Sequence, residues 1–244
     1  MYSMEIDALV FDIDGTLYPY ELMYLKSLPL FVKYPRFIFN FGKVRKTIRK
    51  DRTGRDNKAG LHFEPVELFR KRQAELLSLR LGITEEDALL YITRIIYGEW
   101  INIFRGIKPY RGVIRLLEYL KRRGIKLGVL SDFPPHVKLK SLGIDKYFNA
   151  VLCSEESGKL KPDPAPFKLV CERLHSENDK TLYVGDNPHY DISGAKGAGL
   201  KTALFCGVLA KLEGLKNKQR IESADIIFSN YKDFLHILLK IFDN

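Results

Sequence analysis

Two carboxylates lie one residue apart near the N-terminus, where a short apolar run ends. The run, residues 8–11, is typical of a strand that is buried on both faces. Two acids this close repel each other unless a cation lies between them or one of them carries a proton. In the alternating geometry of a strand, Asp12 and Asp14 point to the same side and can face one site. Gly15 allows a sharp turn and the Thr16 hydroxyl can bond back to the carboxylates, so this turn is a candidate catalytic site.

Ser131 and Asp132 follow a second apolar run, residues 125–130, which predicts another buried strand. At a strand end, a hydroxyl and the backbone N–H groups that follow it can hold phosphate oxygens. A simple helix cap or turn explains the same two residues, so both interpretations stay open.

Lys161 lies in the stretch 158–164, whose prolines fix the backbone and give the lysine a set direction. A single lysine more commonly belongs to the protein surface. A lysine that is held in place, however, can offset the charge of several carboxylates and a phosphoryl group. Lys161 is therefore a candidate for the same site.

Two further acids follow the apolar run 181–184. Asp186 stands at the end of this predicted strand, and Asp191 comes five residues later, across a turn. Helix capping is the structural alternative for Asp191, because a helix is predicted over residues 191–198. Asp186 repeats the position that Asp12 has at the end of its own strand, which indicates a shared site.

From residue 109 onward, predicted helices and strands alternate. Such alternation predicts an α/β fold with a doubly wound parallel sheet, helices on both faces and ligands at the carboxyl ends of the strands. The strands are expected at residues 8–11, 125–130, 150–152, 181–184, 201–205 and 224–228, and the helices at 112–123, 135–142, 164–174, 191–198 and 231–242.

Residues 18–108 have a different pattern, which predicts an all-helical insert. The expected elements are a helix over 21–32, a basic helix over 43–50, a loop over 53–57, and helices over 65–81 and from the N-cap Thr84 onward. Pro29 is expected to interrupt the first of these helices, because proline lacks the N–H group that the helix interior needs.

Taken in order, the four polar stretches resemble the four signatures of the haloacid dehalogenase-like hydrolases. Residues 12–17 are similar to the first signature, and Ser131 falls on the serine of the second. Lys161 falls on the lysine of the third, and Asp186 and Asp191 fall on the terminal acidic pair. Most members of this family are phosphatases that use an aspartate nucleophile and magnesium, so the resemblance implies such an enzyme.

The resemblance covers residues 1–17 and about 109–230. It implies a Rossmann-like core made of residues 1–17 and 109–244, and a helical cap domain over residues 18–108. This arrangement is that of the subgroup whose cap lies between the first and second signatures. The insert matches the subgroup only in its place and its helical character.

The resemblance also implies a role for each residue of the site. Asp12 would attack phosphorus and form an aspartyl phosphate, and Asp14 would protonate the leaving oxygen and later take a proton from water. Mg²⁺ would be bound by Asp12, the backbone carbonyl of Asp14 and Asp186, with Asp191 acting on its waters. Oxygen ligands of this kind suit a hard ion better than zinc. Lys161 would hold Asp12 in place.

Thr16, Ser131 and Asp132 would hold the oxygens of the transferring phosphoryl group. Asp14 further favours phosphoryl transfer, because carbon–halogen cleavage has no leaving alkoxide to protonate. We therefore predict a Mg²⁺-dependent phosphatase for a small phosphomonoester, such as a nucleotide or sugar phosphate. A phosphomutase of the family would use the same residues, so hydrolysis and intramolecular transfer both stay open.

The net charge of +10 is concentrated in residues 33–58, which hold ten lysines or arginines and two acids. This stretch could be the solvated face of a basic helix, or it could attract a polyanionic substrate. With the apolar residues near it, the stretch could instead bind an anionic membrane or nucleic acid. That interpretation gives another class of function, in which a phosphatase-like scaffold docks on RNA or anionic lipid. The intact set of four signatures argues against a scaffold without activity.

Nothing after Met1 resembles an export signal, and no apolar stretch is long enough to span a bilayer, so we expect a cytoplasmic protein. Cys153, Cys171 and Cys206 are odd in number and widely spaced. We expect them to be reduced, structural thiols. The expected partner is a small phosphorylated substrate.

Overall fold

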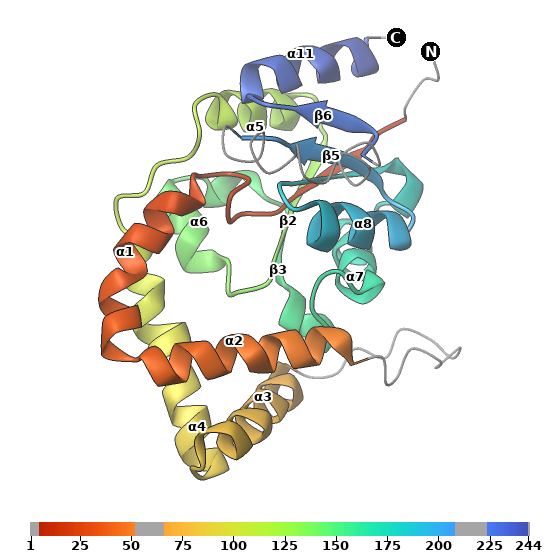
Figure 1. Ribbon diagram of the computed structural model, residues 1–244. Coiled ribbons are helices and arrows are strands. Elements are labelled where there is room, and N and C mark those ends of the chain that lie inside the picture. Colours follow the sequence, from red (N-terminus) through yellow and green to blue (C-terminus); the bar gives the residue numbers. More distant parts are fainter. Residues whose placement is uncertain (1–4, 52–65, 208–223, 244) are drawn as a thin grey trace.

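One sheet of six parallel strands forms the centre of the protein (Figure 1). The computed structural model describes residues 5–51, 66–207 and 224–243, and within them the strand order is β3–β2–β1–β4–β5–β6. The strands are β1 (Ala8–Phe11), β2 (Lys126–Ser131), β3 (Ala150–Cys153), β4 (Thr181–Gly185), β5 (Lys201–Phe205) and β6 (Ile226–Phe228). Every predicted strand is present, and its observed ends lie within two residues of the predicted ends.

Alternate side chains of β1 pack against helices on opposite faces of the sheet. Leu9 and Phe11 pack in the hydrophobic cluster of one face, whereas Ala8 and Val10 pack in that of the other. The first face is covered by α5 (Val113–Arg122), α6 (His136–Leu142) and α11 (Tyr231–Phe242), and the second by α7 (Pro164–Leu174) and α8 (Ser193–Gly197). Three layers result, and the predicted doubly wound α/β fold is confirmed.

β1 lies between β2 and β4, and its register positions the candidate site. Phe11, its last residue, is opposite Val129 of β2 and Val184 of β4. The backbone N–H of Asp12 donates to the carbonyl of Val184 at 2.9 Å. Because these strands are parallel, the polar residues that follow β1, β2 and β4 meet at one edge of the sheet.

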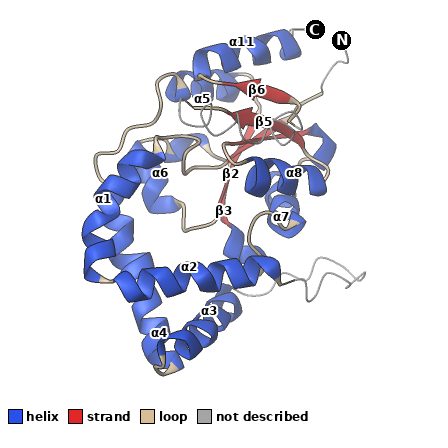
Figure 2. Ribbon diagram, viewed as in Figure 1, coloured by secondary structure: helices blue, strands red, loops and turns tan. Residues whose placement is uncertain are grey.

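The described chain between β1 and α5 folds as helices joined by turns, and we call helices α1 to η2 the helical insert (Figure 2). A hydrophobic cluster of its own holds it together, with Phe37, Phe41, Phe69 and Ile92 among its buried members. The elements are α1 (Tyr20–Lys33), α2 (Pro35–Lys50), α3 (Val66–Leu81), α4 (Glu85–Tyr91), the π-helix η1 (Ile92–Glu99) and the 3₁₀-helix η2 (Trp100–Phe104).

Two predicted details of the insert are wrong. α1 continues through Pro29, which costs one backbone hydrogen bond but leaves the helix packed against η2. Ser27 of α1 accepts a hydrogen bond from the Trp100 indole at 3.2 Å across this contact. α2 begins at Pro35 instead of residue 43, because proline suits the first position of a helix, where its missing N–H needs no partner. The loop predicted over residues 53–57 lies outside the described residues.

The helix predicted from Asp191 begins earlier, at the π-helix η6 (Pro188–Ile192), and continues into α8. Asn187 is its N-cap, and the side-chain oxygen of Asn187 accepts from the backbone N–H groups of His189 and Tyr190 at 3.0 and 2.9 Å. Asp191 is therefore not the N-cap, but its Oδ2 accepts from the backbone N–H of the N-cap residue Asn187 at 3.0 Å, so it also stabilises the start of this helix. The remaining short helices are η3 (Asp145–Tyr147), η4 (Ser154–Ser157) and η5 (Asn178–Lys180).

In the part of the chain that the structure describes, we find no helix that combines the length and the hydropathy needed to cross a membrane. The three cysteines, Cys153, Cys171 and Cys206, are all described, and each is buried and outside any disulfide. Burial raises the pKa of the Cys171 thiol to about 11, so this thiol stays protonated at neutral pH. These features agree with the predicted structural role of the cysteines.

Candidate active site

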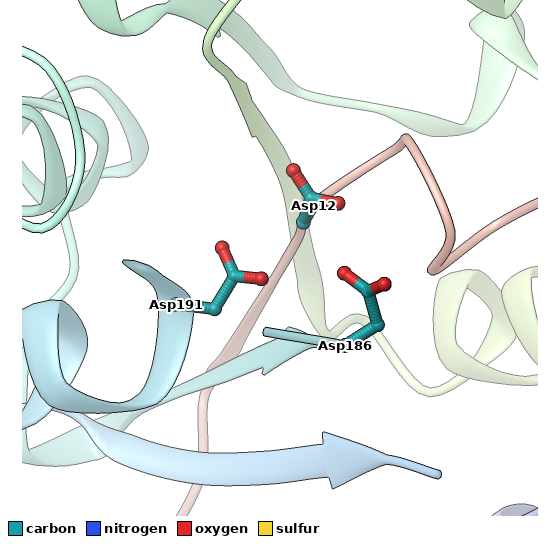
Figure 3. Close-up of side chains that lie close together, drawn as sticks. All are labelled: Asp12, Asp186 and Asp191. Atoms are coloured by element: carbon teal, nitrogen blue, oxygen red, sulfur yellow. The ribbon is translucent and has the colours of Figure 1, made fainter. Parts of the chain in front are cut away.

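Three acids that are distant in the sequence meet at the carboxyl edge of the sheet (Figure 3). Asp12 follows β1, Asp186 follows β4, and Asp191 lies on η6. One carboxylate oxygen from each of them lies within 4.8 Å of the other two. Asp12 and Asp191 are buried and Asp186 is half-buried, so their charges repel one another with little screening by water.

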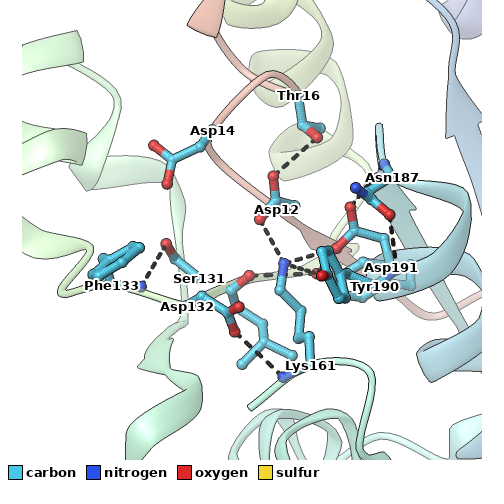
Figure 4. Close-up of polar contacts among 12 residues, drawn as sticks. Asp12, Asp14, Thr16, Ser131, Asp132, Phe133, Lys161, Asn187, Tyr190 and Asp191 are labelled. Carbon is cyan, nitrogen blue, oxygen red and sulfur yellow. Dashed lines mark hydrogen bonds and ion pairs between the residues drawn. The ribbon is translucent and has the colours of Figure 1, made fainter. Parts of the chain in front are cut away.

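Lys161 supplies the nearest positive charge to this cluster (Figure 4). Its Nζ donates to Asp12 Oδ1 at 2.6 Å and to Asp191 Oδ1 at 2.7 Å, and it lies 3.2 Å from the Tyr183 hydroxyl. The ammonium group is buried, yet the two carboxylates hold the pKa of Lys161 well above its ordinary value. Lys161 is therefore a fixed cation between Asp12 and Asp191, in the direction that the neighbouring prolines predicted.

One lysine does not neutralise three carboxylates. Burial, and then the charge of Asp191, raise the pKa of Asp12 from 3.8 to about 7 in spite of Lys161. Burial and the charges of Asp191 and Asp12 raise the pKa of Asp186 well above its ordinary value. The cluster has an excess of negative charge on closely spaced oxygens, which is the environment that a divalent cation fits.

The turn after β1 brings Asp186 against the backbone at Gly15. Gly15 has a φ of +87°, and a Cβ atom on it would lie 2.3 Å from Asp186 Oδ2. Any other residue would be strained and would also displace this carboxylate. The glycine that the sequence suggested for a sharp turn is therefore also the residue that lets Asp186 approach Asp12.

Asp14 lines the same cavity but has separate partners. Its carboxylate forms an ion pair with Lys138 of α6 and accepts a hydrogen bond from the Tyr18 hydroxyl. The Lys138 ammonium is buried, 5.0 Å from the ring centroid of Phe104 and 5.7 Å from that of Phe133. β1 ends at Phe11, so the strand alternation that would align Asp14 with Asp12 does not persist, and the Asp14 carboxylate points away from the acid cluster (Figure 4).

The other predicted phosphate-binding residues are close to Asp12 but already have partners. The Thr16 hydroxyl donates to Asp12 Oδ2 at 3.1 Å, and the Ser131 hydroxyl accepts from the Phe133 N–H at 3.4 Å. Thr16 and Ser131 are fully buried, whereas Asp132 lines the cavity. The Asp132 carboxylate accepts from the backbone N–H of Lys161 at 3.3 Å.

Two arginines of the basic stretch join the helical insert to the sheet edge, which sequence analysis did not predict. Arg45 of α2 forms an ion pair with Glu155 of η4, and both side chains are buried. Arg49 Nη2 lies 2.6 Å from Asp132 Oδ2. Burial alone would raise the pKa of Asp132, but the charge of Arg49, followed by those of Lys161 and Arg45, lowers it to about 2. The interpretation as a solvated face is wrong for Arg45 and Arg49.

The interpretation as a solvated face fits the exposed basic residues of the described part of stretch 33–58, which are Lys33, Arg36, Lys43, Lys46 and Lys50. Glu155 lies two residues after the end of β3, so an acid close to a strand end was a signal that sequence analysis could have used. Lys138 precedes the buried Leu142 by one helical turn, and its place on that face was a weaker signal.

A cavity of about 740 Å³ lies between the sheet edge and the helical insert. Its polar end is lined by Asp12, Asp14, Lys161, Asp186 and Asp191, and its other end by side chains of α1, α2, η1 and η2. The volume suits a ligand of the size of a drug molecule. The arrangement places the Asp12 carboxylate, a fixed lysine and a cluster of acids that could hold a cation at one end of a ligand-sized space.

Comparison with known proteins identifies relatives along most of the chain. The model of the haloacid dehalogenase-like hydrolase family matches residues 6–199. Glyceraldehyde 3-phosphate phosphatase of Methanopyrus kandleri is 30% identical over 215 residues, 81% of this chain and 82% of that protein. Pyrophosphatase PpaX of Halalkalibacterium halodurans is 25% identical over 205 residues, 82% and 84% of the two chains. The crystal structure of 2-haloacid dehalogenase from Pseudomonas syringae has the same fold, with a TM-score of 0.62, 21% identity and coverage of 96% and 99%.

Proposed function

This chain belongs to the haloacid dehalogenase-like hydrolases, and we propose that it hydrolyses a small phosphomonoester with Mg²⁺ through a phosphorylated Asp12. The observation that supports this most strongly is the meeting of Asp12, Asp186 and Asp191 around Lys161 at the edge of the sheet. The two relatives compared above by sequence are named as a phosphatase and a pyrophosphatase, which favours hydrolysis over the predicted alternative of a phosphomutase.

Asp12 is the proposed nucleophile. A carboxylate oxygen of Asp12 forms a bond to phosphorus while the bond from phosphorus to the alcohol oxygen breaks. Lys161, at 2.6 Å, keeps the carboxylate oriented and favours its anionic form against the effect of burial. When bound by Asp12, Asp186 and the Asp14 carbonyl, with Asp191 acting on its waters, Mg²⁺ would neutralise the phosphoryl oxygens and so permit one anion to attack another.

Asp14 is the proposed acid and base. It gives its proton to the departing alcohol oxygen and then takes one from the water that attacks the phosphorus of the intermediate. That second step releases inorganic phosphate and restores the Asp12 carboxylate. Lys138 and Tyr18 hold Asp14 at the cavity wall, and we propose them as positioning residues. The region of Thr16, Ser131 and Asp132 would hold the phosphoryl oxygens, as predicted.

We propose that residues 18–108 act as the cap of a core made of residues 1–17 and 109–244. The ion pairs Arg45–Glu155 and Arg49–Asp132 support this division, because they connect the helical insert to two strand ends beside the site. The alternative of a protein that binds RNA or anionic lipid stays a prediction. Its support among the described residues is the exposed lysines of α2 and the exposed apolar side chains of Leu28, Phe31, Val32 and Phe39.

The proposal is tested by measuring phosphate release from p-nitrophenyl phosphate and a panel of phosphomonoesters, with Mg²⁺ and with EDTA. We expect release that requires the metal and that is restored when Mg²⁺ is added back. Asp186→Asn should remove the response to Mg²⁺, whereas Asp145→Asn, on the exposed helix η3, should behave like the wild type. Release that is equally fast in EDTA would contradict the proposal. Absence of release from the whole panel, with retention on heparin or anionic liposomes, would favour the binding function.

A further inference from the structure

The wall of the cavity that faces the sheet edge is mostly hydrocarbon. The helical insert contributes Met23, Leu30, Phe31, Ile95, Ile96 and Trp100 to it. Among the described residues of the insert that line the cavity, Glu21 and Arg49 are the charged ones. The phosphate end and the opposite end of this space therefore differ sharply in polarity.

One face of α1 forms much of this wall. Tyr20, Met23, Tyr24, Ser27 and Phe31 line the cavity and are spaced three or four residues apart, so they lie along one side of the helix. Ser27 is polar, but its hydroxyl already has two partners. It donates to the Met23 carbonyl at 2.7 Å and accepts from the Trp100 indole N–H at 3.2 Å. This face therefore offers a ligand mainly aromatic and aliphatic contacts.

Of the described lysines and arginines of α1 and α2, only Arg49 lines the cavity. Lys33 forms an exposed ion pair with Glu99 at 3.1 Å, outside the lining residues. Arg49 does line the cavity, but it is bound to Asp132 Oδ2 at 2.6 Å and donates to the Lys161 carbonyl at 3.2 Å. Among the described residues of the insert that line the cavity, Arg49 is the one cation, so a second phosphate or a carboxylate on a ligand would have to share it with Asp132. The tyrosine hydroxyls of Tyr20 and Tyr24 and the Glu21 carboxylate are polar groups of this lining. Sugar hydroxyl groups that lie instead against its hydrocarbon would lose water without gaining equivalent partners, which is costly.

We propose that the substrate is the phosphomonoester of a bulky apolar alcohol, whose aromatic or branched hydrocarbon part lies against the insert wall. The proposal rests on the proposed phosphatase function and names the substrate class for the same site. The products are inorganic phosphate and the apolar alcohol, which receives its proton from Asp14. The rings of Tyr24 and Phe31 line the cavity and are 53% and 42% exposed, so they present apolar surface that such a group would cover.

The test compares two esters that differ mainly in polarity. Cyclohexylmethyl phosphate and glucose 6-phosphate each carry a phosphate on a primary alcohol next to a six-membered ring, so their leaving groups are similar. With Mg²⁺, we expect kcat/KM to be at least about a hundredfold higher for cyclohexylmethyl phosphate, because several hydroxyl groups would be buried unpaired in the sugar ester. Equal values, or a preference for glucose 6-phosphate, would overturn the proposal.

Substitutions on α1 test whether the residues that line the cavity, and not the other residues of the helix, determine the preference between the two esters. Phe31→Asn should lower the preference for cyclohexylmethyl phosphate about tenfold, and Tyr24→Asn should act in the same direction. Leu28→Asn is the matched control, since Leu28 is 54% exposed on the same helix and does not line the cavity. A preference that survives both wall substitutions would contradict the assignment of this surface.

The outcomes also separate this inference from the proposed function. Metal-dependent hydrolysis of both esters without preference would reject the apolar substrate class and leave the phosphatase intact. Failure to hydrolyse either ester or any member of the phosphomonoester panel would reject both proposals. Thermal unfolding midpoints of the Phe31 and Tyr24 variants close to that of the wild type would exclude misfolding as the cause of a lost preference.

Discussion

The two ends of the cavity are built by opposite chemistry. At the sheet edge, buried charged groups such as Asp12 and Lys161 are fixed by partners at hydrogen-bonding distance. At the helical insert, residues such as Phe31 and Ile96 present hydrocarbon. On the proposals above, the fixed charges would determine which bond is broken, whereas the apolar wall would select the group attached to it. The difference would then allow one reaction centre to be kept while a separate set of helices chooses the substrate.

The two ends are also connected differently to the rest of the chain. The sheet edge is held by strand pairing, whereas the insert reaches it through Arg45 and Arg49. Arg45 is the deeper of the two, and its partner Glu155 also accepts from the Tyr97 hydroxyl at 2.9 Å. Experiments on each region should therefore give distinct results.

The largest effect is expected at the sheet edge. Asp12→Asn should reduce kcat at least about 10⁴-fold for every ester, because an amide cannot act as the nucleophile.

The stability of the Asp12→Asn variant is the control. The folded chain holds a proton at Asp12 more tightly than the unfolded chain does, so ionisation of Asp12 costs stability as the pH rises from 3.8 to about 7. At pH 8 without Mg²⁺, the variant should therefore be at least as stable as the wild type in thermal unfolding. A much less stable variant would show that its lost activity reflects unfolding.

The next largest effect is expected at the junction of the two regions. Arg45→Met removes the nearer cation of the buried Glu155 carboxylate and leaves it with Arg70, whose Nε lies 3.9 Å from Glu155 Oε2. The substitution should lower the free energy of unfolding by about 3 kcal/mol. The double variant Arg45→Met with Glu155→Gln should regain part of this loss, as urea unfolding can measure. Lys46→Met changes the exposed neighbour on α2 and serves as the control. An unchanged midpoint for Arg45→Met would mean that this ion pair does not hold the insert in place.

A smaller and graded effect is expected from pH. Because the pKa of Asp12 is raised to about 7 and that of Asp186 is also raised, protons compete with Mg²⁺ for these oxygens below that pH. The apparent Mg²⁺ affinity should fall roughly tenfold per pH unit for each proton displaced, and the contribution of the Asp12 proton should disappear above pH 8. Titration calorimetry in two buffers with different ionisation enthalpies would measure the released protons. Affinity that is constant from pH 5 to pH 8 would contradict the proposed ligand set.

The smallest effect is expected on the outer surface of the insert. Lys33→Met removes the exposed ion pair with Glu99, which water already screens, so stability and kcat/KM should both stay within experimental error. Urea unfolding and steady-state kinetics would check this. A clear loss of activity would mean that surface charge on the insert attracts the substrate, and it would weaken the contrast between the two ends.

The sheet edge could be predicted from sequence because its signal is local. A buried run followed at once by an acid marks Asp12 and Asp186, and the prolines near Lys161 indicate a fixed side chain. A looser form of this rule, with one residue allowed between the strand and the acid, would have marked Glu155 after β3. The fold of the sheet domain could be predicted for a similar reason, since each strand and each helix is a short segment with a clear apolar pattern.

The junction could not be predicted in the same way. Arg45 follows the buried residues Phe41 and Val44 on one stripe of α2, which indicates that it faces inward, but its partner Glu155 is 110 positions away. Helical periodicity shows that a side chain is buried and does not show what it meets. The ion pair between Asp14 and Lys138 was missed for the same reason, because it joins residues 124 positions apart.

The central claim is that Asp12 itself receives the phosphoryl group, and chemical trapping tests it most directly. Wild-type protein mixed with Mg²⁺ and a hydrolysed ester is quenched within one turnover and treated with borohydride, which reduces an acyl phosphate to an alcohol. Peptide mass spectrometry should then find homoserine at position 12, and none in protein quenched without substrate. Rapid phosphate release with position 12 unmodified, or with the modification on another acid, would contradict the claim.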